Sequence, residues 1–200
     1  MDVTDIKEPH TMIHFAFGWI NEDFTVSVKG VEEQFEKFKN LNNGIKKIIS
    51  WGGWAFSNEA PTTHIIRKAV RPENVGAFVN NVVNFVVDNN LDGVDFDWEY
   101  PGATDIQYAD PGNPEDGPNY LAFLKMLKRR LTGKTVSFAA PASYWYLRHF
   151  PIADIAKVAD YIVYMTYDLH GQWDVGNKYV SYVFIFYMTL TFSSGKIAQT

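Results

Sequence analysis

The chain alternates short β-type segments with helical segments. Runs rich in β-branched and aromatic residues predict five strands, at Thr11–Phe17, Lys46–Gly53, Gly93–Glu99, Thr135–Pro141 and Tyr161–Asp168. Helical periodicity predicts three helices, at Val31–Leu41, Glu73–Asn90 and Pro118–Leu131. Strands that alternate with helices become parallel neighbours joined by right-handed crossovers. This pattern indicates an α/β fold, either an open doubly wound sheet or a β/α barrel.

Composition excludes several classes of function. Of the 200 residues, 46% are hydrophobic, which is enough for the core of a globular domain. The formal net charge of −5 argues against a nucleic-acid partner, since such proteins usually present a clustered basic face. The apolar stretch Tyr182–Phe192 is shorter than the roughly 20 residues that a membrane-spanning helix needs, so we expect no membrane partner. Residues Met1–His10 lack the basic region and apolar core of a secretory signal peptide.

Metal chemistry is not indicated by the residues that could supply it. The chain has no cysteine, so it has neither disulfides nor a thiolate metal site. The five histidines show no ligand spacing; they are His10, His14, His64, His149 and His170. We therefore expect no metal.

One predicted strand carries three acids on one face. Side chains alternate along an extended strand, so Asp95, Asp97 and Glu99 point the same way. A row of buried carboxyls is costly, but neighbouring carboxylates raise the pKa of the last acid, which can then act as a general acid near neutral pH. The alternatives are a solvated acidic edge and a calcium or magnesium site. Phe96 and Trp98 on the other face argue against a solvated edge, and the spacing fits no EF-hand.

Three motifs carry a resemblance to a known family. The pattern Asp92-x-x-Asp95-x-Asp97-x-Glu99 resembles the signature of glycoside hydrolase family 18, whose members include chitinases. Ser50–Trp51–Gly52–Gly53 resembles the family's Ser-x-Gly-Gly motif, and Met165–Thr166–Tyr167–Asp168 resembles its sixth-strand motif. The motifs follow the family's order. The likeness covers about Thr11–Lys178, and Tyr161–Asp174 especially resembles fungal members.

The resemblance implies part of a (β/α)8 TIM barrel. A complete barrel needs eight strands and roughly 250 residues, whereas this chain offers roughly strands two to six. We expect residues 1–178 to form a partial family 18 catalytic domain. Residues 179–200 break the β/α pattern and are expected to form a tail outside the family.

The resemblance also implies a reaction and the residues that perform it. A chitinase hydrolyses β-1,4 linkages between N-acetylglucosamine units of chitin and chitooligosaccharides with retention, using the substrate's acetamido oxygen as nucleophile and no cofactor. Glu99 corresponds to the general acid and base, and Asp97 to the residue that orients the acetamido group. Asp95 shares charge with Asp97, Tyr167 corresponds to the phenol that binds the acetamido carbonyl, and Asp92 is expected to be structural.

Further residues are expected to bind substrate or support the acids. The candidate substrate-binding residues are Trp54, Tyr100, Met165, Asp168 and Trp173. The candidate supporting residues are Ser50, placed behind Asp95, and Gly52 and Gly53, which allow close backbone approach. Tyr144 and Trp145 are weaker candidates for contact with the glycan.

The sequence is compatible with several functions. The chain is a chitinase, a chitin-binding protein without turnover, or an inactive fragment of such an enzyme. Within the enzyme class, an endo-N-acetylglucosaminidase shares the acid strand and mechanism. The resemblance also implies an extracellular protein, and we expect a monomer.

Overall fold

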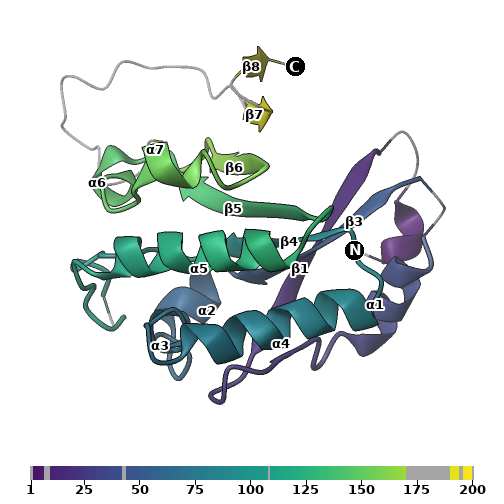
Figure 1. Cartoon of the computed structure of the whole chain (residues 1–200), viewed down its shortest axis with the longest axis horizontal. Helices are drawn as coiled ribbons and strands as arrows, with labels where there is room; N and C mark the ends of the chain where they lie inside the picture. The colour runs from purple at the N-terminus through teal and green to yellow at the C-terminus, as the bar shows by residue number, and fades with distance from the viewer. Residues whose placement is uncertain are drawn as a thin grey trace.

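The computed structural model describes residues 2–6, 10–41, 44–107, 109–169, 190–193 and 196–199. Its centre is a sheet in the order β2-β1-β3-β4-β5-β6 (Figure 1). The strands are β1 (Met12–Ile20), β2 (Val26–Ser27), β3 (Lys46–Gly52), β4 (Gly93–Asp97), β5 (Thr135–Pro141) and β6 (Tyr161–Met165). Strands β1 and β3 to β6 pair in parallel, and β2 returns antiparallel to β1. The five predicted strands are therefore confirmed as a parallel set.

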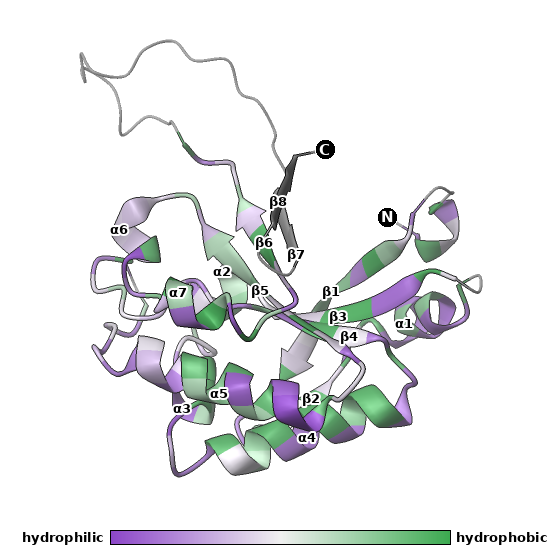
Figure 2. Cartoon of the chain, turned by 45° about the horizontal axis from the view of Figure 1, so that its top comes forward, coloured by the Kyte–Doolittle hydropathy of each residue, from purple (hydrophilic) through white to green (hydrophobic). Residues whose placement is uncertain are grey.

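Helices cover one face of this sheet. They are α1 (Glu32–Lys39), α2 (Trp54–Asn58), α3 (Ile65–Ala69), α4 (Val75–Asp88), α5 (Asp116–Arg130), α6 (Tyr144–Leu147) and α7 (Ile152–Ile155), after a 3-10 turn η1 (Val3–Asp5). Helices α1, α4 and α5 are the three that periodicity predicts. Helices α4 and α5 lie side by side below the sheet (Figure 1), and hydrophobic and hydrophilic residues form stripes along them (Figure 2). Each therefore has one buried face.

Strand order decides between the two predicted architectures. In a doubly wound sheet the order reverses at a switch point. Here the parallel strands follow one another without reversal, which is the arrangement of a barrel. The structure is thus a partial β/α barrel, whose sheet ends at β2 and β6 within the described residues.

Two predicted strands are shorter than expected at their carboxyl ends. β4 ends at Asp97 and β6 at Met165, so Glu99 and Asp168 lie just beyond the ladder. After β4, the carbonyl of Asp97 accepts a hydrogen bond from the Gly53 amide, in the loop that follows β3. Asp168 has a φ of 53°, a left-handed conformation that ends an extended segment. Both acids therefore lie on loops at the carboxyl edge of the sheet.

Aromatic rings fill the layer between sheet and helices. The Phe96 ring meets Phe123 of α5 edge-on, with centroids 4.8 Å apart, and Phe123 stacks on Phe78 of α4 at 5.0 Å. Trp98 packs edge-on against Tyr120 at 5.5 Å. Phe96 and Trp98 therefore face the helices as predicted, and the acids that alternate with them face the barrel interior.

The remaining described residues lie near the carboxyl end. Strands β7 (Leu190–Ser193) and β8 (Lys196–Gln199) form a separate antiparallel pair. They fall in the predicted tail, of which residues 179–189 lie outside the described residues. None of the described helices is long and apolar enough to span a membrane.

Candidate active site

The three acids of the motif lie on the interior face of β4 and just beyond its end. Asp95, Asp97 and Glu99 are buried, with 4%, 9% and 8% of their surface exposed. Gly52 lies directly beside them, because a Cβ added there would meet the Asp97 carbonyl oxygen at 2.1 Å. The Gly53 amide donates to the same oxygen at 2.8 Å. The close backbone approach expected of this glycine pair is thus present.

Burial controls the protonation of Asp97 and Glu99. Burial raises the pKa of Asp97 to about 8, and the neighbouring charges of Glu99 and Asp95 add to that rise. The pKa of Glu99 is also raised, first by burial and then by the charge of Asp168, while hydrogen bonds from Tyr100 and Asp97 oppose the rise. The expected cause, repulsion along the strand, is therefore secondary for Glu99, because its hydrogen bond with Asp97 lowers the pKa.

One oxygen of Asp97 is left without a partner. Its Oδ1 atom is buried and accepts no hydrogen bond within the part of the chain that the structure describes. A buried acceptor without a donor is costly and uncommon in folded proteins. The backbone around the acids is fixed by contrast, since the amide of Glu99 donates to Ser57 Oγ at 3.1 Å. The site therefore offers an acceptor to a donor supplied from outside.

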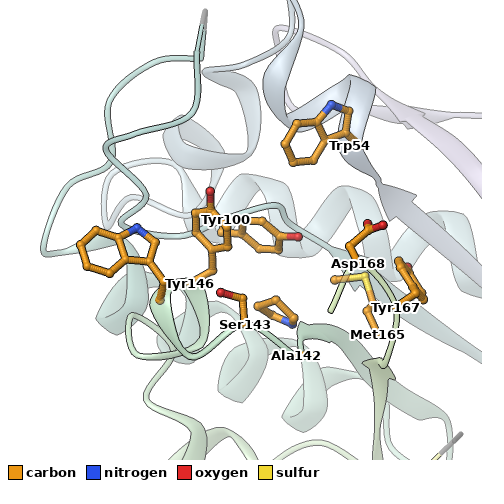
Figure 3. Close-up of a pocket in the computed structure, with 10 residues that line it drawn as sticks. Trp54, Tyr100, Ala142, Ser143, Tyr146, Met165, Tyr167 and Asp168 are labelled. Atoms are coloured by element: carbon orange, nitrogen blue, oxygen red, sulfur yellow. The ribbon is translucent and has the colours of Figure 1, made fainter. Parts of the chain in front are cut away.

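An open cavity of about 550 Å³ lies at the carboxyl edge of the sheet (Figure 3). Its walls come from loops at the carboxyl ends of β3 to β6, the edge where barrels carry their active sites. The lining residues are Trp54, Tyr100, Pro141, Ala142, Ser143, Trp145, Tyr146, Met165, Tyr167 and Asp168. All but one of the predicted substrate-binding residues are thus brought together. The exception, Trp173, lies outside the described residues.

Aromatic rings on this rim are both exposed and held in place. Trp54 and Tyr167 are 50% and 52% exposed. Tyr100 stacks on Tyr146 with centroids 4.5 Å apart. Trp145 donates from Nε1 to Asp105 at 2.8 Å, and the Arg148 guanidinium lies 3.6 Å from its ring. Flat, ordered apolar rings suit the C–H faces of sugars.

A second cavity of about 360 Å³ lies beneath, in the barrel interior. Asp95, Asp97, Met165 and Tyr167 line it together with His14, Ala16, Phe17, Ser50, Ala139, Tyr161, Ile162 and Val163. Ser50 Oγ donates to Asp95 Oδ2 at 3.0 Å, the position expected for this residue, and Ser137 Oγ donates to Asp95 Oδ1 at 2.7 Å. Ser137 is not among the residues predicted from the sequence. Its signal is a buried polar residue that lies between apolar neighbours, Val136 and Phe138, in the strand.

Asp92 has a different role, at the opposite end of β4. Its Oδ2 accepts a hydrogen bond from the backbone amide of Lys47 at 2.8 Å. The residue thereby joins the amino ends of β3 and β4, as expected for a structural acid. Among the described residues, no cluster of three or more histidines and acids could hold a metal ion.

A buried ion pair holds the loop that follows the acids. Asp116, 2% exposed, accepts hydrogen bonds at Oδ2 from Arg67 Nε at 2.9 Å and from the amides of Gly102 and Asn113 at 3.0 Å each. The Arg67 guanidinium also lies 5.8 Å from the Trp98 ring centroid. Asp116 therefore fixes the start of the loop from Gly102 to Gly117, which follows the acids.

Replacing Asp116 with asparagine is expected to lower the free energy of unfolding by about 2 kcal/mol, because hydrogen bonds to a charged, buried acceptor are lost or weakened. Urea denaturation followed by tryptophan fluorescence measures this. The matched control is Asp154→Asn, whose partner Lys157 forms an exposed ion pair. That change is expected to cost less than about 1 kcal/mol. Equal losses in the two variants would contradict the proposed role of Asp116.

Comparisons with known proteins agree on one family. The model for Glycosyl hydrolases family 18 matches residues 4–189. "Secreted chitinase LysM12" of Penicillium expansum is 52% identical over 170 residues, covering 84% of this chain and 11% of its own length. "Probable chitinase LysM11" of the same organism is 48% identical over 183 residues, covering 90% and 16%.

A solved structure shows the same arrangement of elements. The Group IV chitinase of Ostrinia furnacalis, in complex with allosamidin, superposes with a TM-score of 0.73 at 30% identity. The match covers 87% of this chain and 48% of that one. The chain thus spans less than a fifth of these curated relatives and about half of the solved catalytic chain.

Proposed function

The chain belongs to family 18 of the glycosyl hydrolases, and on this premise we propose that it hydrolyses β-1,4 linkages of N-acetylglucosamine in chitin and chitooligosaccharides. The observation that carries the proposal is the buried row of acids that ends at Glu99, together with an open cavity lined by aromatic rings at the same edge of the sheet. The relatives named as chitinases support the same substrate class. No cofactor or metal is part of the proposal.

Glu99 is the proposed acid and base. Burial raises the pKa of Glu99 and so favours its protonated form, which gives the proton to the glycosidic oxygen. The C1–O bond then breaks as the substrate's acetamido oxygen bonds to C1, which gives an oxazolinium ion. Glu99, now ionised, takes a proton from water, whose oxygen attacks C1 from the face of the departed sugar. The C1–O bond of the oxazolinium ion breaks in the same step, which restores the acetamido group. The product keeps its anomeric configuration.

Asp97 and Tyr167 are proposed to hold the acetamido group. The unpaired Oδ1 of Asp97 is an acceptor for the acetamido N–H. Burial raises the pKa of Tyr167, so its phenol stays protonated and can donate to the acetamido carbonyl. Tyr167 lines both cavities, which places it between the aromatic rim and the acids. Trp54, Tyr100, Met165 and Asp168 are the proposed sugar contacts, and Trp173 is proposed as a further contact from the family resemblance alone.

Localisation and organisation follow from the same premise. We propose an extracellular monomer in which residues 1–178 form the catalytic part and residues 179–200 a separate tail. One relative is named as secreted. The family match itself runs to residue 189.

The test is hydrolysis of N-acetylchitooligosaccharides by the purified chain. We expect fluorophore release from a chitobiose or chitotriose glycoside, and proton NMR of a chitotetraose digest should show the β-anomer forming first. Binding to chitin beads without release would instead favour a binding protein that uses the same aromatic rim. Release from an N-glycan core but not from chitooligosaccharides would favour an endo-N-acetylglucosaminidase.

A further inference from the structure

Polar residues from five strands meet on the interior face below the acids. Ser50, Asp95, Ser137 and Tyr161 are direct register partners across β3 to β6, and His14 joins them from β1. Ser50 and Ser137 are 2% and 0% exposed. His14 and Tyr161 belong to none of the motifs, and the proposed reaction does not use them. Their contacts nevertheless lead to Asp95.

When the His14 ring is neutral, the hydrogen bonds in this group have one consistent direction. Ser50 has a single hydroxyl proton and donates it to Asp95 Oδ2 at 3.0 Å. His14 Nδ1 lies 3.1 Å from Ser50 Oγ, so the nitrogen must be the donor and carry the proton. In the neutral ring Nε2 is then an acceptor, and it receives the Tyr161 hydroxyl. The order of donation is Tyr161, His14, Ser50, Asp95.

This order matters because Asp95 stands next to the reacting pair. Its other oxygen accepts a hydrogen bond from Ser137 Oγ, so both oxygens accept from hydroxyl donors, an arrangement that suits a carboxylate. A fixed negative charge on Asp95 helps to keep the proton on Asp97, whose pKa rises in part because of that charge. The charged and titratable groups that face His14 are Asp95, with Oδ2 3.7 Å from Nδ1, and Tyr161.

We propose that His14 is a positioning residue. Its contact with Ser50 directs the Ser50 hydroxyl proton to Asp95, and this hydrogen bond favours Asp95 as the ionised acid of the row. The proposal rests on the proposed function for its effect on turnover. The orientation itself is a property of the folded chain. His14 touches neither the reacting atoms nor the aromatic cavity, so it is not a catalytic residue.

The first test reads the histidine tautomer directly. Long-range proton–nitrogen NMR of the chain labelled with ¹⁵N-histidine, at a pH of about 8.5 where imidazole is neutral, should show the His14 proton on Nδ1. The His14→Gln variant assigns the signal by its absence. Ser50→Ala, which removes the acceptor, should move the proton to Nε2. A proton on Nε2 in the unchanged chain would overturn the proposal.

The second test separates positioning from structural support. His14→Leu removes both hydrogen bonds and is expected to lower kcat about tenfold, with KM within about twofold. His14→Gln keeps one donor and one acceptor and should restore most of kcat. If His14→Leu does not fold by circular dichroism, Tyr161→Phe, which removes one hydroxyl, is measured instead and should lower kcat about threefold. An unchanged kcat in the folded variant would contradict the proposal.

The two tests distinguish the failure of each proposal. If the unchanged chain does not hydrolyse chitooligosaccharides, the proposed function fails. The histidine tautomer alone then tests the order of hydrogen-bond donation from Tyr161 to Asp95. If the chain is active but His14 carries its proton on Nε2, the proposed positioning role of His14 fails and the proposed function stands.

Discussion

Glu99→Gln is expected to lower kcat for chitooligosaccharides by about 10³-fold, the largest loss of activity of any single change at this site. Glutamine has nearly the same shape as glutamate but cannot give a proton to the leaving oxygen or take one from water. The surrounding fold should be unaffected, because the Glu99 backbone is held by Ser57 whatever the side chain. KM should change little, since the aromatic rim that binds the sugars is unaltered.

Fluorophore release measures the expected loss of kcat, and calorimetric binding of chitotetraose tests whether sugar binding is unchanged. The matched control is Glu73→Gln, the same change at an exposed acid in the loop before α4. It should leave kcat and binding within about twofold of the unchanged chain. Comparable losses in both variants would show that charge, rather than proton transfer at Glu99, is responsible, and residual activity near the wild-type level would remove Glu99 from the mechanism.

Much of the fold could be predicted because local patterns and global architecture agree. The alternation of Phe96 and Trp98 with the acids indicates two buried faces, and rings from α4 and α5 fill one of them. Strand ends were less predictable, since they depend on contacts between loops. The left-handed backbone conformation of Asp168 ends the extended segment, and the periodicity of the sequence does not reveal it. The short helices α2, α6 and α7 likewise have too few residues for a helical period.

The site was predictable where residues follow a motif and was missed where they meet only in space. Asp95, Asp97 and Glu99 share one strand, so their common face follows from spacing alone. Ser137 and Tyr161 reach the same layer from separate strands through register. Tyr146 joins Tyr100 only because α6 folds over the loop after β4. The dominance of burial in the pKa of Glu99 also requires the packed structure, because the sequence shows neighbours but not solvent.

Asp97→Asn is expected to lower kcat about 10²-fold while it makes the fold more stable at neutral pH. Asparagine keeps the shape of the side chain but holds no acidic proton, so it cannot form the proton-sharing pair with Glu99. The loss should appear in kcat more than in KM, because the contact with the acetamido group matters most as that group closes on C1. Glu99→Gln and Asp97→Asn together should lose less than the product of the two, since the acids act as a pair.

The stability gain follows from the sign of the pKa shift. The pKa of Asp97 is 3.8 in the reference state and about 8 in the folded chain, so the unfolded chain releases this proton at lower pH than the folded chain. Below a pH of about 4 the carboxyl is protonated in both states and does not lower the free energy of unfolding. As the pH rises from 4 toward 8, it ionises more readily in the unfolded chain, so the free energy of unfolding falls. Asp97→Asn removes that cost and should raise Tm at pH 7 by about 5 °C, with a smaller fall in Tm between pH 4 and pH 8.

Differential scanning calorimetry across this pH range tests the expectation against Asp92→Asn, the same change at the other end of β4. Asp92 accepts a hydrogen bond from the Lys47 amide, and a neutral acceptor there is weaker than a charged one. That control should leave Tm unchanged or lower it. A fall in Tm for Asp97→Asn would mean that Asp97 is ionised in the folded chain. The proton would then lie on another acid of the row, and Asp95 could no longer be taken as the ionised one.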